Sequence, residues 1–208
     1  METSERTVII VGGSVAGLSL ANMLEQVGIR YIVLEAYDEI APQVGASIGL
    51  QPSGLRILDQ LGCAEDVLSL VDVPLNDSYI RRPDGSIIRH NHGLHDNLTE
   101  RHGYPTIFID RQMLLEALHN NLKFRDSVLP GQRVETVTEL DDGVEVRTSK
   151  GDVFRGDIVV GADGIYSTVR REMWRIGNKV SPGYFHADEW SSKTHDSVAE
   201  IDALLWIR

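Results

Sequence analysis

The sequence is short of several residue types, and each shortage excludes a class of function. It has a single cysteine, Cys63, which excludes an intramolecular disulfide framework and a metal cage built from several thiolates. Basic residues are also few, because 20 Lys and Arg stand against 31 Asp and Glu, for a formal net charge of −11. A general nucleic-acid binder needs a basic face for the phosphates, so this balance argues against one.

Long apolar runs are missing as well. No segment approaches the roughly 18 consecutive apolar residues of a membrane-spanning helix, and no apolar signal region precedes Val8. We therefore expect no transmembrane segment and a cytoplasmic location, with peripheral association at an intracellular membrane surface left open. The 208 residues are enough for one large domain, or for one domain and part of a second, and the oligomeric state is not predicted.

The sequence does contain, near its start, a glycine-rich turn between two β-rich runs. The run 8–11 (VIIV) has the density of β-branched residues expected of a strand buried on both faces. Apolar residues then recur at helical spacing as far as Gly28, and a second β-rich run follows at 31–34 (YIVL). The stretch 6–36 therefore predicts a βαβ unit of an α/β fold.

Within that turn, Gly12, Ser14 and Gly17 occupy three positions of a dinucleotide-binding fingerprint, with Ser14 where a second glycine is usual. Gly12 permits the tight turn, the middle residue faces a pyrophosphate, and Gly17 lets the helix pack closely on the strand. Glu35 follows at about the ~20-residue distance at which a carboxylate accepts hydrogen bonds from ribose hydroxyls. Because Ser14 adds a Cβ at the closest approach, a tight α/β turn without a ligand is kept as the alternative to a dinucleotide site.

Two later stretches combine a strand, an abrupt turn and a helix start. The run 158–164 (IVVGADG) ends in Asp163 and Gly164, where the carboxylate either accepts from a ligand or merely caps the next helix. Further back, a strand is predicted to become a helix at Asp110, which puts Arg111 in the first helical turn. The helix macrodipole disfavours a cation there, so Arg111 is a candidate for binding an anionic ligand, with a plain surface arginine as the alternative.

Three histidines, His90, His92 and His95, fall within six residues of one another. Imidazoles this close can chelate a metal ion, but no acidic or cysteine partner stands at the spacing of a known metal motif. We predict no metal site and interpret the segment as an exposed polar loop.

The remaining patterns predict the supporting elements. Residues 36–54 contain three glycines and two prolines and are expected to form a loop. Apolar periodicity predicts helices at about 52–61 and 64–70, and alternation around turn residues predicts a hairpin over 77–92 and a β-meander over 133–155.

Together these patterns resemble the class A flavoprotein monooxygenases, the para-hydroxybenzoate hydroxylase-like family. Three separated signals carry the resemblance: the opening glycine turn with Glu35, the loop 45–55 (GASIGLQPSGL), and the run 157–170 (DIVVGADGIYSTVR). The last combines a buried strand, an Asp-Gly turn and a later Ser and Arg in the family's order. The phrases GASIGLQPSGLRILDQLG and RREMW are similar to those of fungal members that epoxidise the prenyl chains of meroterpenoids and indole diterpenes.

The resemblance implies an α/β fold with a Rossmann-like, glutathione-reductase-type parallel sheet, a β-meander and part of a β-rich substrate domain. It also implies FAD and NAD(P)H as cofactors, and a hydrophobic small-molecule substrate that is epoxidised or hydroxylated in secondary metabolism. By the family pattern Glu35 binds the adenosine ribose, Gly49 lies on the flavin side, Arg111 lies near the FAD pyrophosphate, and Asp163 lies at the diphosphate end. The predicted FAD-binding residues are therefore Gly12, Ser14, Gly17, Glu35, Gly49, Arg111, Asp163 and Gly164. No catalytic acid or base is predicted.

The resemblance further implies a division into domains. The sequence departs from the family pattern at Gln43, where many relatives carry an arginine. The resemblance ends near Trp190, whereas relatives continue into the rest of the substrate domain. We therefore expect a C-terminally truncated chain. The predicted parts are a discontinuous FAD-binding domain at 1–72 and 104–176, substrate-domain segments at 73–103 and 177–190, and a divergent tail at 191–208.

Three hypotheses stay open at this point. The chain is an FAD-dependent monooxygenase or its cofactor-binding half, or another FAD- or NAD(P)H-dependent oxidoreductase such as a reductase, or a non-catalytic flavin-binding remnant. A flavin site that is open to water cannot shield its chemistry, so activity of the isolated chain is a separate question from its family.

Overall fold

The computed structural model describes residues 6–42, 47–71, 73–180 and 204–206. The chain forms two compact units, one of Met1–Pro42 with Leu122–Arg208 and the other of Gln43–Asn121. Each unit is described by itself below. The domain boundaries implied by the resemblance stay a prediction, because compact units of contact need not coincide with domains.

The first unit is built on a sheet with the strand order β12-β11-β1-β2-β7. Strand β2 lies on one side of β1, and β11, which comes much later in the chain, lies on the other side of β1. A topological switch point therefore lies between β1 and β11, and open α/β sheets bind ligands at such points. The parallel strands are β1 (Thr7–Val11), β2 (Arg30–Leu34), β7 (Val128–Leu129) and β11 (Ile158–Gly161), and β12 (Leu204–Trp206), from the tail, adds an antiparallel edge.

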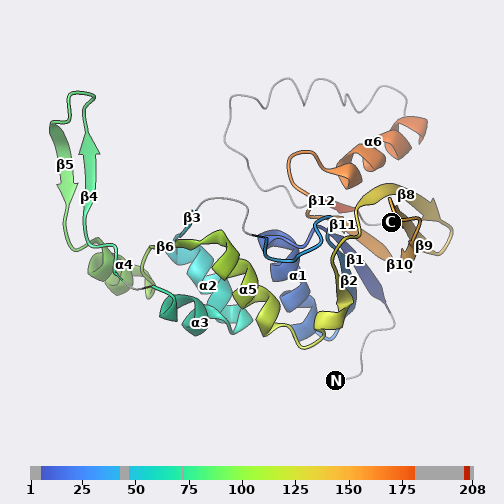
Figure 1. Ribbon diagram of the computed structural model, residues 1–208, viewed down its shortest axis with the longest axis horizontal. Helices are drawn as coiled ribbons and strands as arrows, with labels where there is room; N and C mark the ends of the chain where they lie inside the picture. The colour runs from blue at the N-terminus through green and yellow to red at the C-terminus, as the bar shows by residue number, and fades with distance from the viewer. Residues whose placement is uncertain (1–5, 43–46, 72, 181–203, 207–208) are drawn as a thin grey trace. The chain divides into compact units, whose positions relative to one another are not determined.

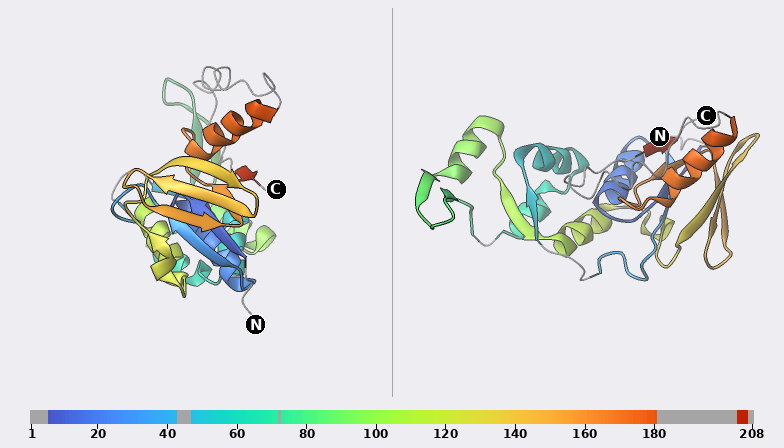
Figure 2. Two further views of the ribbon diagram at one scale, coloured as in Figure 1. Left: turned by 90° about the vertical axis from the view of Figure 1, so that its right-hand side faces the viewer. Right: turned by 90° about the horizontal axis from the view of Figure 1, so that it is seen from above.

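The two faces of this sheet are covered by different elements (Figures 1 and 2). Ile10 faces α1 (Val15–Gln26), where its side chain lies against Gly17. Ile9 and Val11 point to the opposite face, as alternation along a strand requires, and pack against an antiparallel meander and Val169 of α6 (Thr168–Val180). The meander consists of β8 (Val134–Leu140), β9 (Gly143–Thr148) and β10 (Val153–Gly156), which lie across the parallel strands in the left view of Figure 2.

The second unit contains four helices and two small antiparallel sheets within the residues described. The helices are α2 (Pro52–Leu61), α3 (Ala64–Ser69), α4 (Leu94–His102) and α5 (Arg111–Asn121). The sheets pair β3 (Ser47–Leu50) with β6 (Ile107–Asp110), and β4 (Ser78–Arg81) with β5 (Ile87–Asn91). Its buried apolar residues come mainly from α2, α3, α5 and β6: Leu55, Leu58, Leu61, Val67, Ile107, Ile109, Leu114, Leu115 and Leu118.

The predicted βαβ unit, meander, hairpin and helix 52–61 are confirmed, and so is the α/β fold with a parallel sheet. The predicted loop 36–54 is wrong in part, since residues 47–50 form β3 by pairing with a distant strand that local composition does not reveal. The segment of three histidines is not a loop either. His90 lies in β5 and His95 in α4, because the hairpin pairing extends to Asn91 and α4 begins directly after Gly93. Within the described stretches, none of the helices combines the length and the apolar character needed to cross a membrane.

Candidate cofactor-binding site

The carboxyl ends of three parallel strands meet at one edge of the sheet. Val11, the last residue of β1, pairs with the last residues of both β2 and β11. Since these strands run parallel, the segments that follow them begin at the same edge. This edge therefore carries Gly12 after β1, Glu35 after β2 and the turn 162–164 after β11, as the sequence predicted.

Gly12 and Gly17 make a close contact between backbones that leaves no room for side chains. Gly12 has a φ of +106°, and a Cβ at this position would overlap the carbonyl group of Ala162. A Cβ at Gly17 would overlap the carbonyl oxygen of Gly12. Helix α1 therefore packs directly on the turn, which is the close approach that a dinucleotide-binding fingerprint requires.

Ser14 is the N-cap residue of α1, and its backbone is extended, with φ −90° and ψ −165°. Any residue adopts this conformation, so serine in place of the usual glycine causes no backbone strain. Its side chain makes no capping hydrogen bond to the helix, and the first turn of α1 holds no acidic residue. The Ser14 hydroxyl therefore does not cap α1, and no carboxylate in the first turn offsets the partial positive charge of the helix N-terminus, which suits an anionic ligand.

Glu35 is buried, with 8% of its surface exposed, at the carboxyl end of β2. Its Oε2 accepts a hydrogen bond from the Gly13 N–H at 2.5 Å, and its Oε1 accepts one from the Tyr37 N–H at 2.8 Å. A carboxylate offers about four lone-pair positions, so these two bonds orient Glu35 and leave acceptor capacity for hydroxyl groups. This role of Gly13 was not predicted from the sequence. The presence of a second glycine directly after Gly12 could have indicated it, because a Cβ at Gly13 would lie only 3.1 Å from the Glu35 Cβ.

Asp163 lies beside the glycine turn, because its backbone nitrogen is 3.1 Å from where a Cβ on Gly12 would be. Its carboxylate binds its own segment, accepting hydrogen bonds from the Ser167 Oγ at 2.5 Å and from the Thr168 and Val169 N–H groups at 2.6 and 3.2 Å. Asp163 therefore caps α6, one of the two alternatives that the sequence left open. These bonds hold the first N–H groups of α6, which begins at Thr168.

The other predicted site residues are placed as follows. Gly164 has a φ of +78°, a left-handed conformation that favours glycine. In the second unit, Gly49 of β3 stands opposite Phe108 of β6, and a Cβ there would approach the Phe108 ring to 2.9 Å. Arg111 is the first residue of α5, directly after the end of β6 at Asp110, as the sequence predicted. Positions 43 and 45, on which the resemblance also drew, lie outside the described residues.

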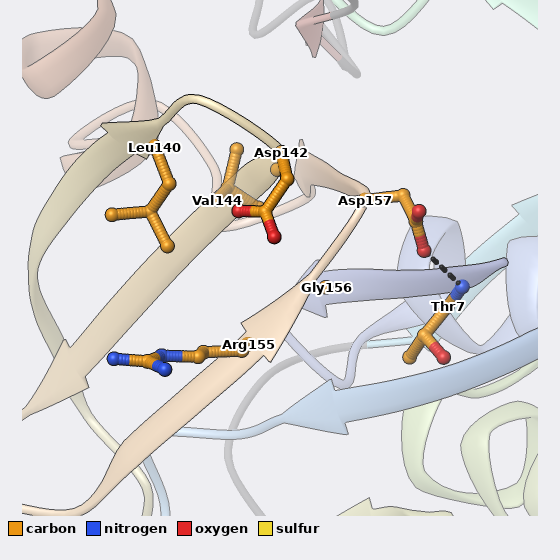
Figure 3. A pocket seen from close by; sticks show the side chains of 8 residues that line it. Thr7, Leu140, Asp142, Val144, Arg155, Gly156 and Asp157 are labelled. Carbon is orange, nitrogen blue, oxygen red and sulfur yellow. Dashed lines mark hydrogen bonds between the residues drawn. The ribbon is translucent and has the colours of Figure 1, made fainter.

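A pocket of about 260 Å³ lies elsewhere in the first unit (Figure 3). Thr7 begins β1 and Asp157 directly precedes β11, and the Thr7 N–H donates to the Asp157 Oδ2 at 2.6 Å. The pocket therefore lies at the amino ends of the parallel strands, whereas ligands of α/β sheets bind at the carboxyl ends. It is not a candidate for the cofactor. Its lining comprises Thr7, Leu140, Asp142, Gly143, Val144, Arg155, Gly156 and Asp157.

The one cysteine of the chain is buried in the second unit. Burial, with a smaller contribution from the charge of Asp66, raises the pKa of the Cys63 thiol to about 11. The thiolate is the reactive form, so the raised pKa and the burial of Cys63 disfavour a role as a nucleophile at neutral pH.

Comparison with known proteins agrees with this geometry. A family model described as an FAD binding domain matches residues 5–180. The chain is 43% identical over 194 residues to the FAD-dependent monooxygenase penE of Penicillium thymicola, covering 93% of this chain and 40% of that relative. It is 47% identical over 188 residues to the FAD-dependent monooxygenase prhF of Penicillium brasilianum, covering 90% and 39%. The chain thus spans about 40% of the length of these curated relatives.

Solved structures show the same fold. Klebsiella pneumoniae HpxO, complexed with FAD and uric acid, matches with a TM-score of 0.70 and 30% sequence identity, over 81% of this chain and 41% of that chain. The tetrameric form of 2-methyl-3-hydroxypyridine-5-carboxylic acid oxygenase matches with a TM-score of 0.65 and 26% identity, over 83% and 43%. These likenesses confirm the predicted Rossmann-like fold with its parallel sheet and meander.

Proposed function

Since this chain belongs to the FAD binding domain family, we propose that it forms the cofactor-binding part of an FAD-dependent monooxygenase. The observation that carries the proposal is the Glu35 carboxylate, which the Gly13 N–H orients beside a glycine turn at the carboxyl edge of a parallel sheet. The similarity to penE and prhF supports a monooxygenase over other flavin enzymes.

The residues at this edge fit the ADP half of FAD, because Gly12 and Gly17 let α1 pack directly on the turn after β1, as a dinucleotide-binding fingerprint requires. In the proposed arrangement Glu35 accepts from the hydroxyls of the adenosine ribose, and the N-terminus of α1, with Ser14 at its cap, faces the diphosphate. Asp163 holds the second turn, including Gly164, by capping α6. Gly49 and Arg111 stay proposed for the flavin side and the pyrophosphate. When bound, FAD supplies the electron transfer and the oxygen chemistry, and the protein supplies binding and orientation.

For the whole protein we propose NAD(P)H as the electron donor and a prenylated or terpenoid small molecule of secondary metabolism as the substrate, which is epoxidised or hydroxylated. The support is the similarity of the chain to the fungal FAD-dependent monooxygenases. The domain division at 1–72 with 104–176 and a cytoplasmic location are part of the same proposal, the latter supported by the single cysteine being a free thiol.

Flavin binding by the 208-residue chain tests the cofactor part of the proposal. We expect one FAD per chain in a titration followed by flavin fluorescence, with ADP displacing FAD and with FMN binding far more weakly because it lacks the adenosine. A chain that binds neither flavin contradicts the proposal, and a chain that binds FMN as tightly as FAD contradicts the role of Glu35.

The monooxygenase part is tested by turnover. NAD(P)H oxidation that increases with a prenylated substrate and consumes an equal amount of oxygen supports it. NAD(P)H oxidation that proceeds only with an artificial electron acceptor, and without substrate-dependent oxygen uptake, favours a reductase instead.

A further inference from the structure

Away from the candidate cofactor site, the hairpin of β4 and β5 gathers three side chains of metal-ligand type. Ser78 pairs with Asn91 and Tyr79 with His90, so Asp77 stands opposite His92 one step beyond the last pair. Successive side chains of a strand alternate between faces, so Asp77 and Tyr79 share one face of the hairpin with the two histidines. The register thus places two imidazoles and a carboxylate side by side.

The distances within this cluster suit a shared ligand. The Asp77 Oδ1 lies 2.6 Å from the His90 Nε2 and 2.9 Å from the His92 Nδ1. One ligand atom from each of the three side chains lies within 4.8 Å of the others. In a tetrahedral zinc site with bonds of about 2.0–2.1 Å, ligand atoms are about 3.4 Å apart. Each of the two distances from the Asp77 Oδ1 to an imidazole nitrogen therefore needs to increase by less than about 1 Å. The three side chains are 41–79% exposed, and an ion can reach them from solvent.

One of the imidazoles is held in place before any ion binds. The ring of Tyr79 stacks on His90, with 4.2 Å between ring centroids and 10° between the ring planes. Arg81 in turn lies over the Tyr79 ring at 5.0 Å. Because the stack restricts the rotation of His90, less side-chain entropy is lost when this residue becomes a ligand.

The charges around the cluster favour a cation. The Asp77 carboxylate lies within hydrogen-bonding distance of both imidazoles and brings a negative charge to the cluster. Asp96 adds a second negative charge near His92.

We propose that Asp77, His90 and His92 bind a divalent transition-metal ion of the Zn²⁺ type, which clamps β4 to β5 at the open end of the hairpin. Two imidazoles and one carboxylate are a donor set that zinc uses in proteins, and water completes the coordination. A two-stranded hairpin is marginally stable by itself, so a cross-link that closes the loop 77–92 has a structural effect. No metal site was predicted from the sequence, because known metal motifs have an acidic partner at a fixed spacing along the chain, whereas Asp77 lies near the histidines across the two strands.

The test is a calorimetric titration of the full 208-residue chain with Zn²⁺, after removal of any affinity tag. We expect one Zn²⁺ per chain, and an affinity that falls by at least about tenfold in each of Asp77→Ala, His90→Ala and His92→Ala. His102→Ala is the matched control, since His102 is also exposed, at the end of α4, and its replacement should leave the affinity unchanged.

Co²⁺ in place of Zn²⁺ gives a second readout that unfolding alone does not mimic. We expect visible absorption bands of the intensity typical of four-coordinate cobalt, and their loss in His92→Ala, while circular dichroism shows that each variant keeps its fold. A wild-type chain that binds no Zn²⁺ overturns the proposal. So does equal binding by wild type and His92→Ala, or an equal loss of binding in the His102→Ala control.

Discussion

Two turns lie at the carboxyl edge of the parallel sheet, one over residues 12–14 after β1 and the other over residues 162–167 after β11. Each joins a buried strand to a helix and has a carboxylate close to it. In the first turn the carboxylate is that of Glu35, which comes from β2 and binds the Gly13 N–H over 22 residues of sequence. In the second it is that of Asp163, which binds three donors within the next six residues.

The difference decides which helix can receive a phosphate. A diphosphate needs N–H donors at a helix N-terminus, and these donors are available only where no side chain of the protein already binds them. The Asp163 carboxylate binds the Thr168 and Val169 N–H groups of α6, whereas Ser14 makes no capping hydrogen bond to α1. We infer that α1 faces the diphosphate and that Asp163 positions the second turn.

The largest effect is expected from Gly17→Ala, which tests whether the first turn depends on contact between backbones. The added Cβ would overlap the Gly12 carbonyl oxygen, and a backbone group cannot move aside as a side chain does. We expect a loss of about 3 kcal/mol, the upper end of the usual range for overpacking, in urea unfolding followed by circular dichroism. FAD binding should be lost together with the turn.

Gly54→Ala is the matched control for this prediction. Gly54 also lies in the first turn of a helix, α2, but a Cβ there meets only the Leu50 Cδ2 at 3.9 Å. This variant should be unchanged or stabilised by roughly 0.5 kcal/mol, because alanine favours helix over glycine. An equal loss of unfolding free energy in the two variants would show that the close backbone contact of Gly17 does not contribute to stability.

Glu35→Ala tests the long-range carboxylate of the first turn. Two hydrogen bonds from a ribose to a charged acceptor are removed, each worth about 1.5–3 kcal/mol, so FAD binding should weaken by about 2 kcal/mol or more. That is a loss of about 30-fold in affinity, measurable by flavin fluorescence. FMN has no adenosine ribose and serves as the control ligand, whose weaker affinity should stay the same. Unchanged FAD affinity would refute the role of Glu35.

Asp163→Ala tests the local carboxylate of the second turn. Ser167 directly precedes α6 and accepts from the Arg170 N–H, whereas Asp163 accepts from the first two N–H groups of the helix. Removing these acceptors should cost about 1–2 kcal/mol, as the loss of an N-cap does, so we expect that loss in urea unfolding together with a smaller loss of FAD affinity than in Glu35→Ala. Asp163→Asn should keep most of the stability, because asparagine caps helices as well as aspartate does. If the Asn variant is stable but loses FAD affinity as strongly as Glu35→Ala, Asp163 contacts the cofactor and the two turns are functionally alike.

The parts of the fold that were predicted from the sequence are those that local patterns determine. Three local patterns each indicate which side chains of an element are buried: the apolar run 8–11, the helical periodicity after it, and the alternation over 133–155. The strand, the helix and the meander that they predict are all confirmed. The positions of Gly12 and Gly17 were also predictable. Gly12 has a positive φ, which favours glycine, and Gly17 lies where the helix packs too closely on the turn for a Cβ.

What was not predicted depends on partners that are distant along the chain. Nothing near residues 47–50 indicates that they pair with β6. The predicted hairpin over 77–92 brings Asp77 near His92, but the local pattern does not determine the strand register that places the two residues opposite each other. The Asp-Gly turn was ambiguous for a different reason. A carboxylate that caps a helix and one that binds a ligand look the same in sequence. The bonds from Ser167 and Thr168 show the first role for Asp163, and the second role stays a prediction.

Ser14→Gly is expected to have the smallest effect, and it tests whether the first turn tolerates a side chain where the fingerprint usually has glycine. With φ −90° and ψ −165°, Ser14 is unstrained, so glycine gains no conformational relief and costs only a few tenths of a kcal/mol at an N-cap. The neighbouring Gly13, whose N–H binds Glu35, already gives the backbone its close approach. FAD affinity should therefore change by less than about threefold, equivalent to roughly 0.6 kcal/mol, in the same fluorescence titration. A tenfold gain in affinity would instead mean that the Ser14 Cβ obstructs the diphosphate, and that the turn is a weakened form of the usual glycine turn.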